Sequence, residues 1–128
     1  MNAFVTVLCI LFSVLSYGQS PDCKKFHNGK FYIQKDGITG TTIERLGNVQ
    51  FETDESQGLR IQLEVNWLDE CTYTLRLVEV IQNDNNRPFN KDIVVMVEII
   101  STENNGYTQR STIEGVDGVY ESKMIKID

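Results

Sequence analysis

Residues Leu59–Trp67 alternate without exception between apolar and polar side chains, with the apolar ones at the odd positions. A period of two belongs to a β-strand that has one face on a core and the other in water. Val49–Thr53 and the first half of Cys71–Gln82 alternate in the same way. Beyond residue 20, apolar positions at helical spacing are always interrupted by a glycine or a β-branched cluster. The pattern therefore predicts an all-β domain.

Short turn signals separate these alternating runs. Asp36-Gly37, Gly47-Asn48 and Asn104-Asn105-Gly106 indicate hairpins, because these residue types tolerate the positive φ of tight turns. Short connections favour antiparallel neighbours, and the one long connection is the polar loop Asn83–Asp92. The sequence predicts an antiparallel up-and-down meander of about eight strands that closes into a barrel, with a two-sheet sandwich as the alternative. The expected strands are Lys30–Gln34, Thr41–Leu46, Val49–Thr53, Leu59–Trp67, Cys71–Gln82, Ile93–Thr102, Tyr107–Ile113 and Val119–Ile127.

Three local features qualify this pattern. The alternation loses its phase at Val78–Ile81, which predicts a bulge or a second buried face. Ile93–Ile100 is nearly all apolar, which is typical of a strand covered on both sides. Asp117-Gly118 is the expected turn before the last strand.

The N-terminal segment predicts export. Ala3–Leu15 is apolar, and no residue from Met1 to Ser20 is charged. The run is shorter than the roughly twenty residues of a membrane span, and Ser16-Tyr17-Gly18 offers small residues before a cut at Gln19. We therefore expect a signal peptide at 1–18, a single domain at 19–128, and a periplasmic or secreted protein with no stable membrane anchor. A short anchor or a buried helix is the alternative reading of this segment.

The number of cysteines and the net charge narrow the class of protein further. Of three cysteines, Cys9 lies in the expected signal peptide, which leaves Cys23 and Cys71 as one pair. In an oxidising compartment we expect them to form a disulfide that closes the domain, the alternative being two free thiols. The net charge of −6 makes nucleic acid a poor partner, because phosphate backbones repel an acidic surface.

Two motifs carry a resemblance to a known set of proteins. Cys23-Lys24-Lys25-Phe26-His27-Asn28-Gly29-Lys30-Phe31 fits C-x-x-F-x-x-G-x-F, and Trp67–Leu75 fits W-x-x-x-C-x-[YF]-x-L. Arg45 and Gln50-x-Glu52 lie between them and belong to the same resemblance. Together they resemble small secreted proteins of Bacteroidota bacteria, over the first half of the expected domain. The resemblance implies a secreted, lipocalin-like β-fold and no particular activity. Some of those proteins carry a DNA topoisomerase name, which does not fit an exported, acidic chain of this length.

The available side chains argue against catalysis. His27 is the only histidine, it lies in a turn, and no Gly-x-Ser-x-Gly elbow accompanies it. With the cysteines bonded, zinc sites of cysteine and histidine are excluded, and Asn83–Asn86 lacks the spacing of a calcium loop. We expect a protein that is not an enzyme and has no cofactor or metal.

Two functions of different classes fit these observations. The first is the binding of a small, mainly apolar ligand inside the barrel, because eight strands enclose room for side chains or one small ligand. The residues expected to line that interior are Phe51, Leu63, Trp67, Tyr73 and Leu75. The aromatic side chains near the disulfide have an alternative role as a packed cluster at the barrel's end.

The second function is that of a solidly packed barrel, a structural or interaction module that binds an extracytoplasmic protein or a glycan through its loops. Arg87 and Phe89, in the loop Asn83–Asp92, are the expected contacts. A hollow interior would favour the first function, and a filled interior would favour the second.

Overall fold

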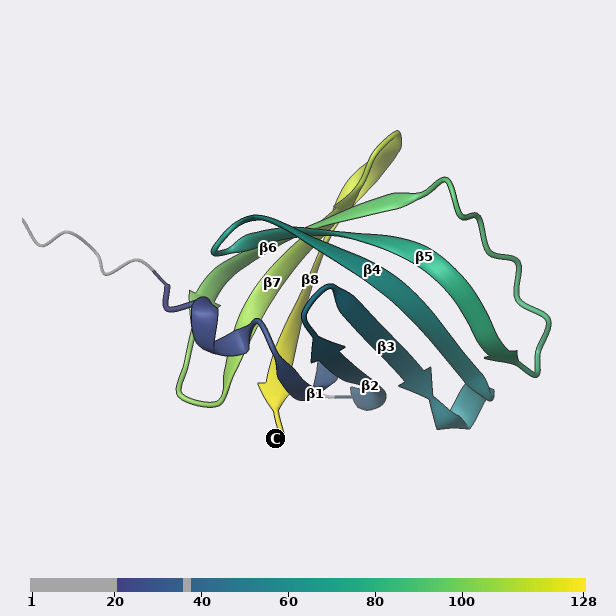
Figure 1. Cartoon of the computed structure of the whole chain (residues 1–128), viewed down its shortest axis with the longest axis horizontal. Helices are drawn as coiled ribbons and strands as arrows, with labels where there is room; N and C mark the ends of the chain where they lie inside the picture. The colour runs from purple at the N-terminus through teal and green to yellow at the C-terminus, as the bar shows by residue number, and fades with distance from the viewer. Residues whose placement is uncertain (1–20, 36–37) are drawn as a thin grey trace, which may run out of the picture.

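The chain forms a closed barrel of eight antiparallel strands that follow one another in sequence order (Figure 1). This architecture comes from a computed structural model that describes residues 21–35 and 38–128. The strands are β1 (Gly29–Lys35), β2 (Ile38–Leu46), β3 (Val49–Asp54), β4 (Leu59–Asp69), β5 (Thr72–Asn83), β6 (Val94–Thr102), β7 (Gly106–Ile113) and β8 (Val116–Lys126). The predicted up-and-down, lipocalin-like barrel is confirmed, and the sandwich alternative is wrong. The expected signal peptide lies outside the described residues.

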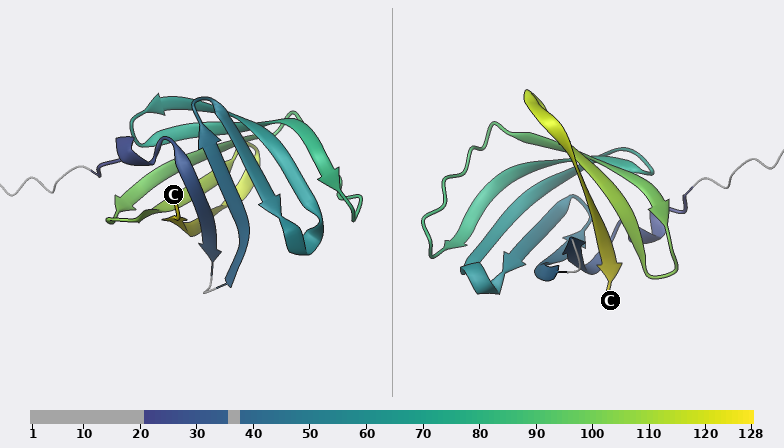
Figure 2. Two further views of the ribbon diagram at one scale, coloured as in Figure 1. Left: turned by 60° about the horizontal axis from the view of Figure 1, so that its bottom comes forward. Right: turned by 180° about the vertical axis from the view of Figure 1, so that it is seen from behind.

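Strand pairing is complete at one end of the barrel and partial at the other. β5 pairs with β6 only over Thr72–Arg76, although β5 continues to Asn83. β1 closes the barrel against β8 over four pairs, from Phe31↔Lys126 to Gln34↔Lys123. Beyond these pairs the β5–β6 loop and the β7–β8 hairpin diverge, as Figures 1 and 2 show. The barrel is therefore splayed at the end that carries residues 84–93.

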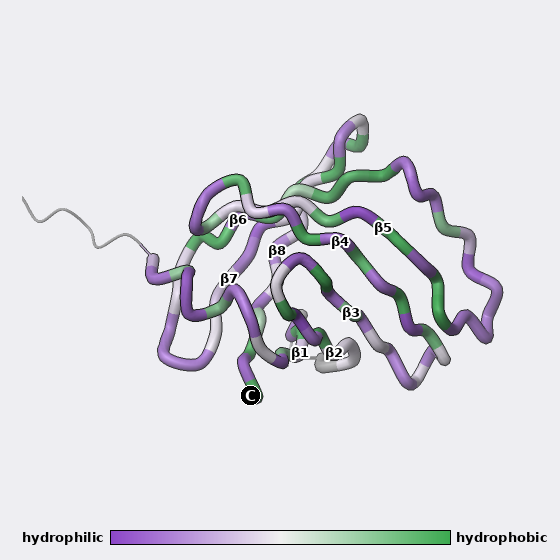
Figure 3. The backbone as a smooth tube through the Cα atoms, viewed as in Figure 1, coloured by the Kyte–Doolittle hydropathy of each residue, from purple (hydrophilic) through white to green (hydrophobic). Residues whose placement is uncertain are grey.

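The expected bulge in β5 is present. Leu63 pairs with Leu77, and Gln62 pairs with Glu79, so Val78 has no partner on β4. Figure 3 shows the alternating hydropathy of β4. Ile61, Leu63 and Val65 of this strand are buried, whereas Leu68 near its end is 54% exposed. After the bulge, alternate side chains of β5 face inward again, and Val78 itself is 43% exposed.

Two local expectations are wrong. β6 is not covered on both sides, because Val95 and Val97 face inward while Met96 on the outer face is 46% exposed. The last turn falls at Gly115, which adopts φ of +78°, and not at Asp117-Gly118. β8 therefore begins at Val116, three residues earlier than the sequence suggested, and Gly118 lies within the strand.

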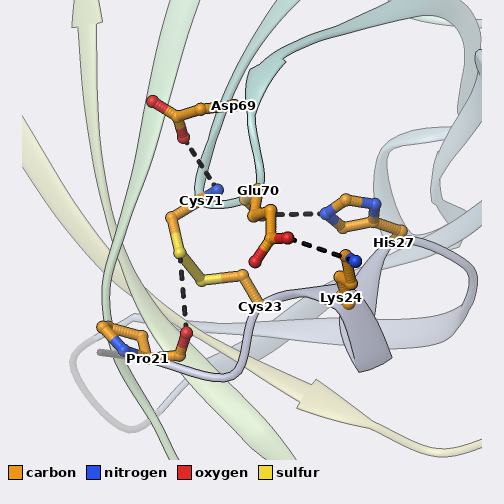
Figure 4. A network of polar contacts seen from close by, with 7 residues as sticks. All are labelled: Pro21, Cys23, Lys24, His27, Asp69, Glu70 and Cys71. Carbon is orange, nitrogen blue, oxygen red and sulfur yellow. Dashed lines mark hydrogen bonds and ion pairs between the residues drawn. A yellow bond between two sulfur atoms is a disulfide. The ribbon is translucent and has the colours of Figure 1, made fainter. Parts of the chain in front are cut away.

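A plug of packed side chains closes the fully paired end. η1 (Lys24–Phe26) lies across it, with Phe26 fully buried and its ring centroid 5.3 Å from that of Tyr107. The predicted Cys23–Cys71 disulfide is confirmed, with 5.3 Å between the Cα atoms. It joins the residue before η1 to the β4–β5 turn (Figure 4).

Further contacts fasten η1 to the same turn. The ring of His27 stacks on that of Trp67 at 3.6 Å, and its Nε2 atom lies 2.8 Å from the carbonyl oxygen of Glu70. Lys24 forms an ion pair of 3.2 Å with Glu70 (Figure 4). His27 is thus engaged in structural contacts at the closed end.

Candidate functional site

The half of the barrel that lies away from the plug is hollow. A cavity of about 380 Å³ lies inside it, within the 300–1,000 Å³ that ligand pockets commonly span. Its apolar walls are formed by Ile33, Ile43, Ile61, Leu63, Leu75, Val95, Val97 and Met124. The polar residues that border it are Gln50, Glu52, Tyr73, Gln109, Ser111, Tyr120, Glu121 and Ser122.

A buried arginine separates this cavity from the plug. Arg45, on β2, is only 2% exposed. Its Nε atom donates to Oε1 of Gln50 at 2.8 Å, and its Nη1 atom donates to the carbonyl oxygen of Phe26 at 2.9 Å. Its Nη2 atom donates to the hydroxyls of Tyr73 and Tyr107, each at 3.0 Å. All three guanidinium nitrogens therefore have partners within the protein, as a buried charge requires.

The same network extends to both walls of the cavity. On β3, Nε2 of Gln50 donates to Oε1 of Glu52 at 3.0 Å. On the opposite side, the hydroxyl of Tyr73 donates to Oε1 of Gln109 at 3.1 Å, and Nε2 of Gln109 donates to Ser122 at 3.0 Å. The cavity thus has a polar floor that runs from β3 to β8, beneath apolar walls.

Burial and hydrogen bonding determine which side chains of this polar floor are charged. Burial alone would lower the pKa of Arg45, but the adjacent hydroxyls of Tyr73 and Tyr107 outweigh it, and the pKa is raised. Burial raises the pKa of Tyr73 well above its usual value. The arginine therefore stays charged and the phenol stays protonated at neutral pH.

Glu52 has a different environment. It is half-buried, and its remaining surface borders the cavity. Burial raises the pKa of its carboxyl, against the opposing effects of the Gln50 hydrogen bond and the charge of Arg45. One donor, from Gln50, contacts this carboxyl within the described part of the chain, so it retains the capacity to accept others.

The β5–β6 loop covers the splayed side of the cavity. A second hollow of about 190 Å³ lies beneath Pro88, Phe89 and Ile93, and it shares part of its apolar wall with the main cavity. The shared residues are Ile61, Leu63, Leu75 and Val95. The two hollows are therefore adjacent, and the loop forms a cover at their common edge.

Arg87 and Phe89, the expected partner contacts, have different surroundings. Nη2 of Arg87 donates to the side chain of Gln57, the last residue of η2 (Glu55–Gln57), at 3.2 Å. The backbone of Arg87 exchanges two hydrogen bonds of 2.9 Å with the side chain of Asn83. Phe89 lines the hollow under the loop. Both residues retain exposed surface in the same loop, with Phe89 40% exposed.

The structure brings three of the five expected lining residues together and separates the other two. Leu63, Tyr73 and Leu75 border the cavity. Trp67 lies in the plug, with its ring centroid 4.5 Å from that of Tyr73 and the ring of His27 stacked on it. Trp67 thus belongs to the packed cluster that was the alternative expectation for the aromatic residues.

The expectation that Phe51 faces the interior is wrong. Its register partner on β4 is Gln62, which faces outward, and the guanidinium of Arg60 lies 4.6 Å from its ring centroid. Phe51 borders a surface depression of about 610 Å³ together with Leu46 and Val49. Alternation along β3 identifies two faces, but here the polar face, with Gln50 and Glu52, is the inner one.

Strand alternation assigns the buried polar residues to solvent faces, so it gave no sign of their burial. The resemblance included Arg45, Gln50 and Glu52 but gave them no role.

No protein-family model matches the chain, and comparisons with curated proteins and with solved structures find no match either. Within the described residues, no helix is long and apolar enough to cross a membrane, and no group of three or more metal-ligating side chains occurs.

Proposed function

We propose that this protein is an exported, non-catalytic carrier of a small, mainly apolar molecule that binds inside the barrel. The observation that carries the proposal is the cavity of about 380 Å³ with apolar walls on most of its strands. Burial of an apolar ligand there would remove both its surface and these walls from water. The covering loop, with Pro88 and Phe89, would supply the route of entry.

The disulfide supports the exported location. Disulfides persist in oxidising compartments, and Cys23–Cys71 closes the plugged end of the barrel. The intact mass of the protein from an extracytoplasmic fraction tests this point. The mass of residues 19–128 with two hydrogens missing would support export, and an uncleaved, reduced chain would contradict it.

Fluorescence titration tests the carrier function. The probe is the neutral, apolar dye N-phenyl-1-naphthylamine, whose emission rises in apolar surroundings. Ser111→Phe would place a ring in the cavity and should weaken binding by about tenfold or more, because overpacking a small site is costly. Met96→Phe, on the outer face of the neighbouring strand, is the matched control and should leave binding unchanged.

Two outcomes would overturn the carrier proposal. One is a wild-type protein that does not bind the dye. The other is equal binding by the wild type and Ser111→Phe, which would place the dye on the outer surface. Either result would favour the alternative function, in which the loops or outer face bind a protein or glycan.

A further inference from the structure

Among the residues that the structure describes, one charged side chain faces into the cavity, and no ion pair of these residues includes it. Glu52 and Glu121 are the charged residues among the described ones that border the cavity. Glu121 pairs in register with Arg110, on the outward-facing positions that alternate with Gln109 and Ser122. Glu52 is therefore the acid that faces the interior. No ion pair of the described residues includes it.

Within the described part of the chain, the polar floor offers acceptors for a positive group and no free cation for a negative one. Arg45 is the nearby cation, and each of its nitrogens donates to Gln50, Phe26, Tyr73 or Tyr107. An anionic ligand would therefore meet Glu52 without a free positive partner. A protonated amine would instead complete the hydrogen bonding of the Glu52 carboxylate in a site with low exposure to water.

We propose that the preferred ligand is a small amphipathic amine, whose apolar body fills the cavity and whose ammonium group binds Glu52. This inference rests on the proposed carrier function and names the chemical class of its ligand. The apolar body would contact Ile61 and Leu63 on β4, beside Glu52, and would extend toward the covering loop.

The surroundings of Glu52 also predict a dependence on pH. β2 presents Arg45 and Ile43 toward it, β4 presents Ile61 and Leu63, and the hydroxyl of Tyr73 on β5 belongs to the same floor. Burial raises the pKa of the Glu52 carboxyl, and an ammonium beside it would lower that pKa again by stabilising the charged form. Affinity for the amine should therefore fall as the pH is lowered and the carboxyl takes up a proton.

Three ligands that share one apolar body separate the contribution of the head group. Octylamine, octanol and octanoate are titrated in parallel at neutral pH against the wild-type protein loaded with N-phenyl-1-naphthylamine, and displacement of the dye is measured. We expect octylamine to bind about tenfold or more tightly than octanol, because charge-assisted hydrogen bonds are the strong ones. Octanoate should bind most weakly.

Glu52→Gln keeps the size of the side chain and its acceptor for Gln50 while removing the charge. This variant should lose the preference for octylamine and its pH dependence, and it should bind octanol within about twofold of the wild type. Glu64→Gln is the matched control, because it removes the same charge from the exposed outer face of β4.

The possible failures are distinguishable. If octanol binds as tightly as octylamine, or octanoate binds best, the amine inference is overturned and the carrier function stands. If Glu52→Gln keeps the preference for octylamine, the assignment to Glu52 is overturned. If the dye itself does not bind to the wild-type protein, there is nothing to displace and both proposals fail.

Discussion

The hydroxyl of Tyr107 lies 3.0 Å from the Nη2 atom of Arg45, although 62 residues separate them in the chain. The bond joins β7 to β2, two strands that are not neighbours in the barrel. It forms because the Arg45 guanidinium is shielded from water and must find all its acceptors among protein groups. The packed end of the barrel is therefore organised around one charge.

Replacing this arginine should destabilise the fold strongly. Arg45→Met removes the donor to Gln50, Tyr73, Tyr107 and the carbonyl of Phe26, and it leaves these buried acceptors with fewer partners. We expect a loss of about 3 kcal/mol or more in the free energy of unfolding. Tyr107→Phe removes one hydroxyl and should cost about 1–2 kcal/mol. Urea unfolding measures both, and Arg110→Met, on the exposed face of β7, should change little. A mild Arg45→Met variant would contradict the role of this charge.

The course of the backbone was predictable from the sequence, for a physical reason. Several strands alternate between apolar and polar side chains, and each short turn restricts its neighbours to antiparallel pairing, so Leu59–Trp67 identifies its element without tertiary information. The boundary at Gly115 was missed because Gly115 and Gly118 both tolerate positive φ, and the pairing of β7 with β8 selects between them.

The interior was harder to predict, because alternation does not tell which face of a strand points inward. Gln50 and Glu52 read as a solvent face, yet they pair in register with inward-facing residues of β4. Their burial depends on Arg45, which is distant from Tyr73 and Tyr107 in the sequence and meets them only in the closed barrel. The polar floor forms only when the strands assemble into the barrel, and the sequence of no single strand indicates it.

Loss of the disulfide should cost a large part of the stability. The double variant Cys23→Ser/Cys71→Ser frees a loop with a sequence separation of 48 residues. The chain-entropy relation gives a loss of about 4 kcal/mol for a loop of this length. Urea unfolding of the variant, and of the wild type with a reductant, should show the same reduced midpoint. An unchanged midpoint would contradict a structural role of the disulfide.

Glu52 should make the stability depend on pH in a defined direction. Burial raises the pKa of this carboxyl in the folded state, so its stabilising contribution is complete below the ordinary value of 4.5 and declines as the pH rises through the folded value. Glu52→Gln should therefore be more stable than the wild type at neutral pH, because the amide carries no charge that burial would penalise. The difference should vanish near pH 4 in thermal unfolding scans. A gain that is the same at both pH values would contradict this origin.

Phe51 and Leu63 provide a paired test of which surface binds ligands. Leu63 is 8% exposed on the cavity wall, so Leu63→Ala should cost about 2–3 kcal/mol and change the affinity for the naphthylamine dye. Phe51→Ala removes the outward contact with Arg60 and should cost about 1 kcal/mol, with the affinity unchanged. Unfolding curves and dye titrations of both variants separate stability from binding. If Phe51→Ala alone weakened binding, the outer depression beside Phe51 would be the ligand site, because the two side chains lie on opposite faces of the barrel wall.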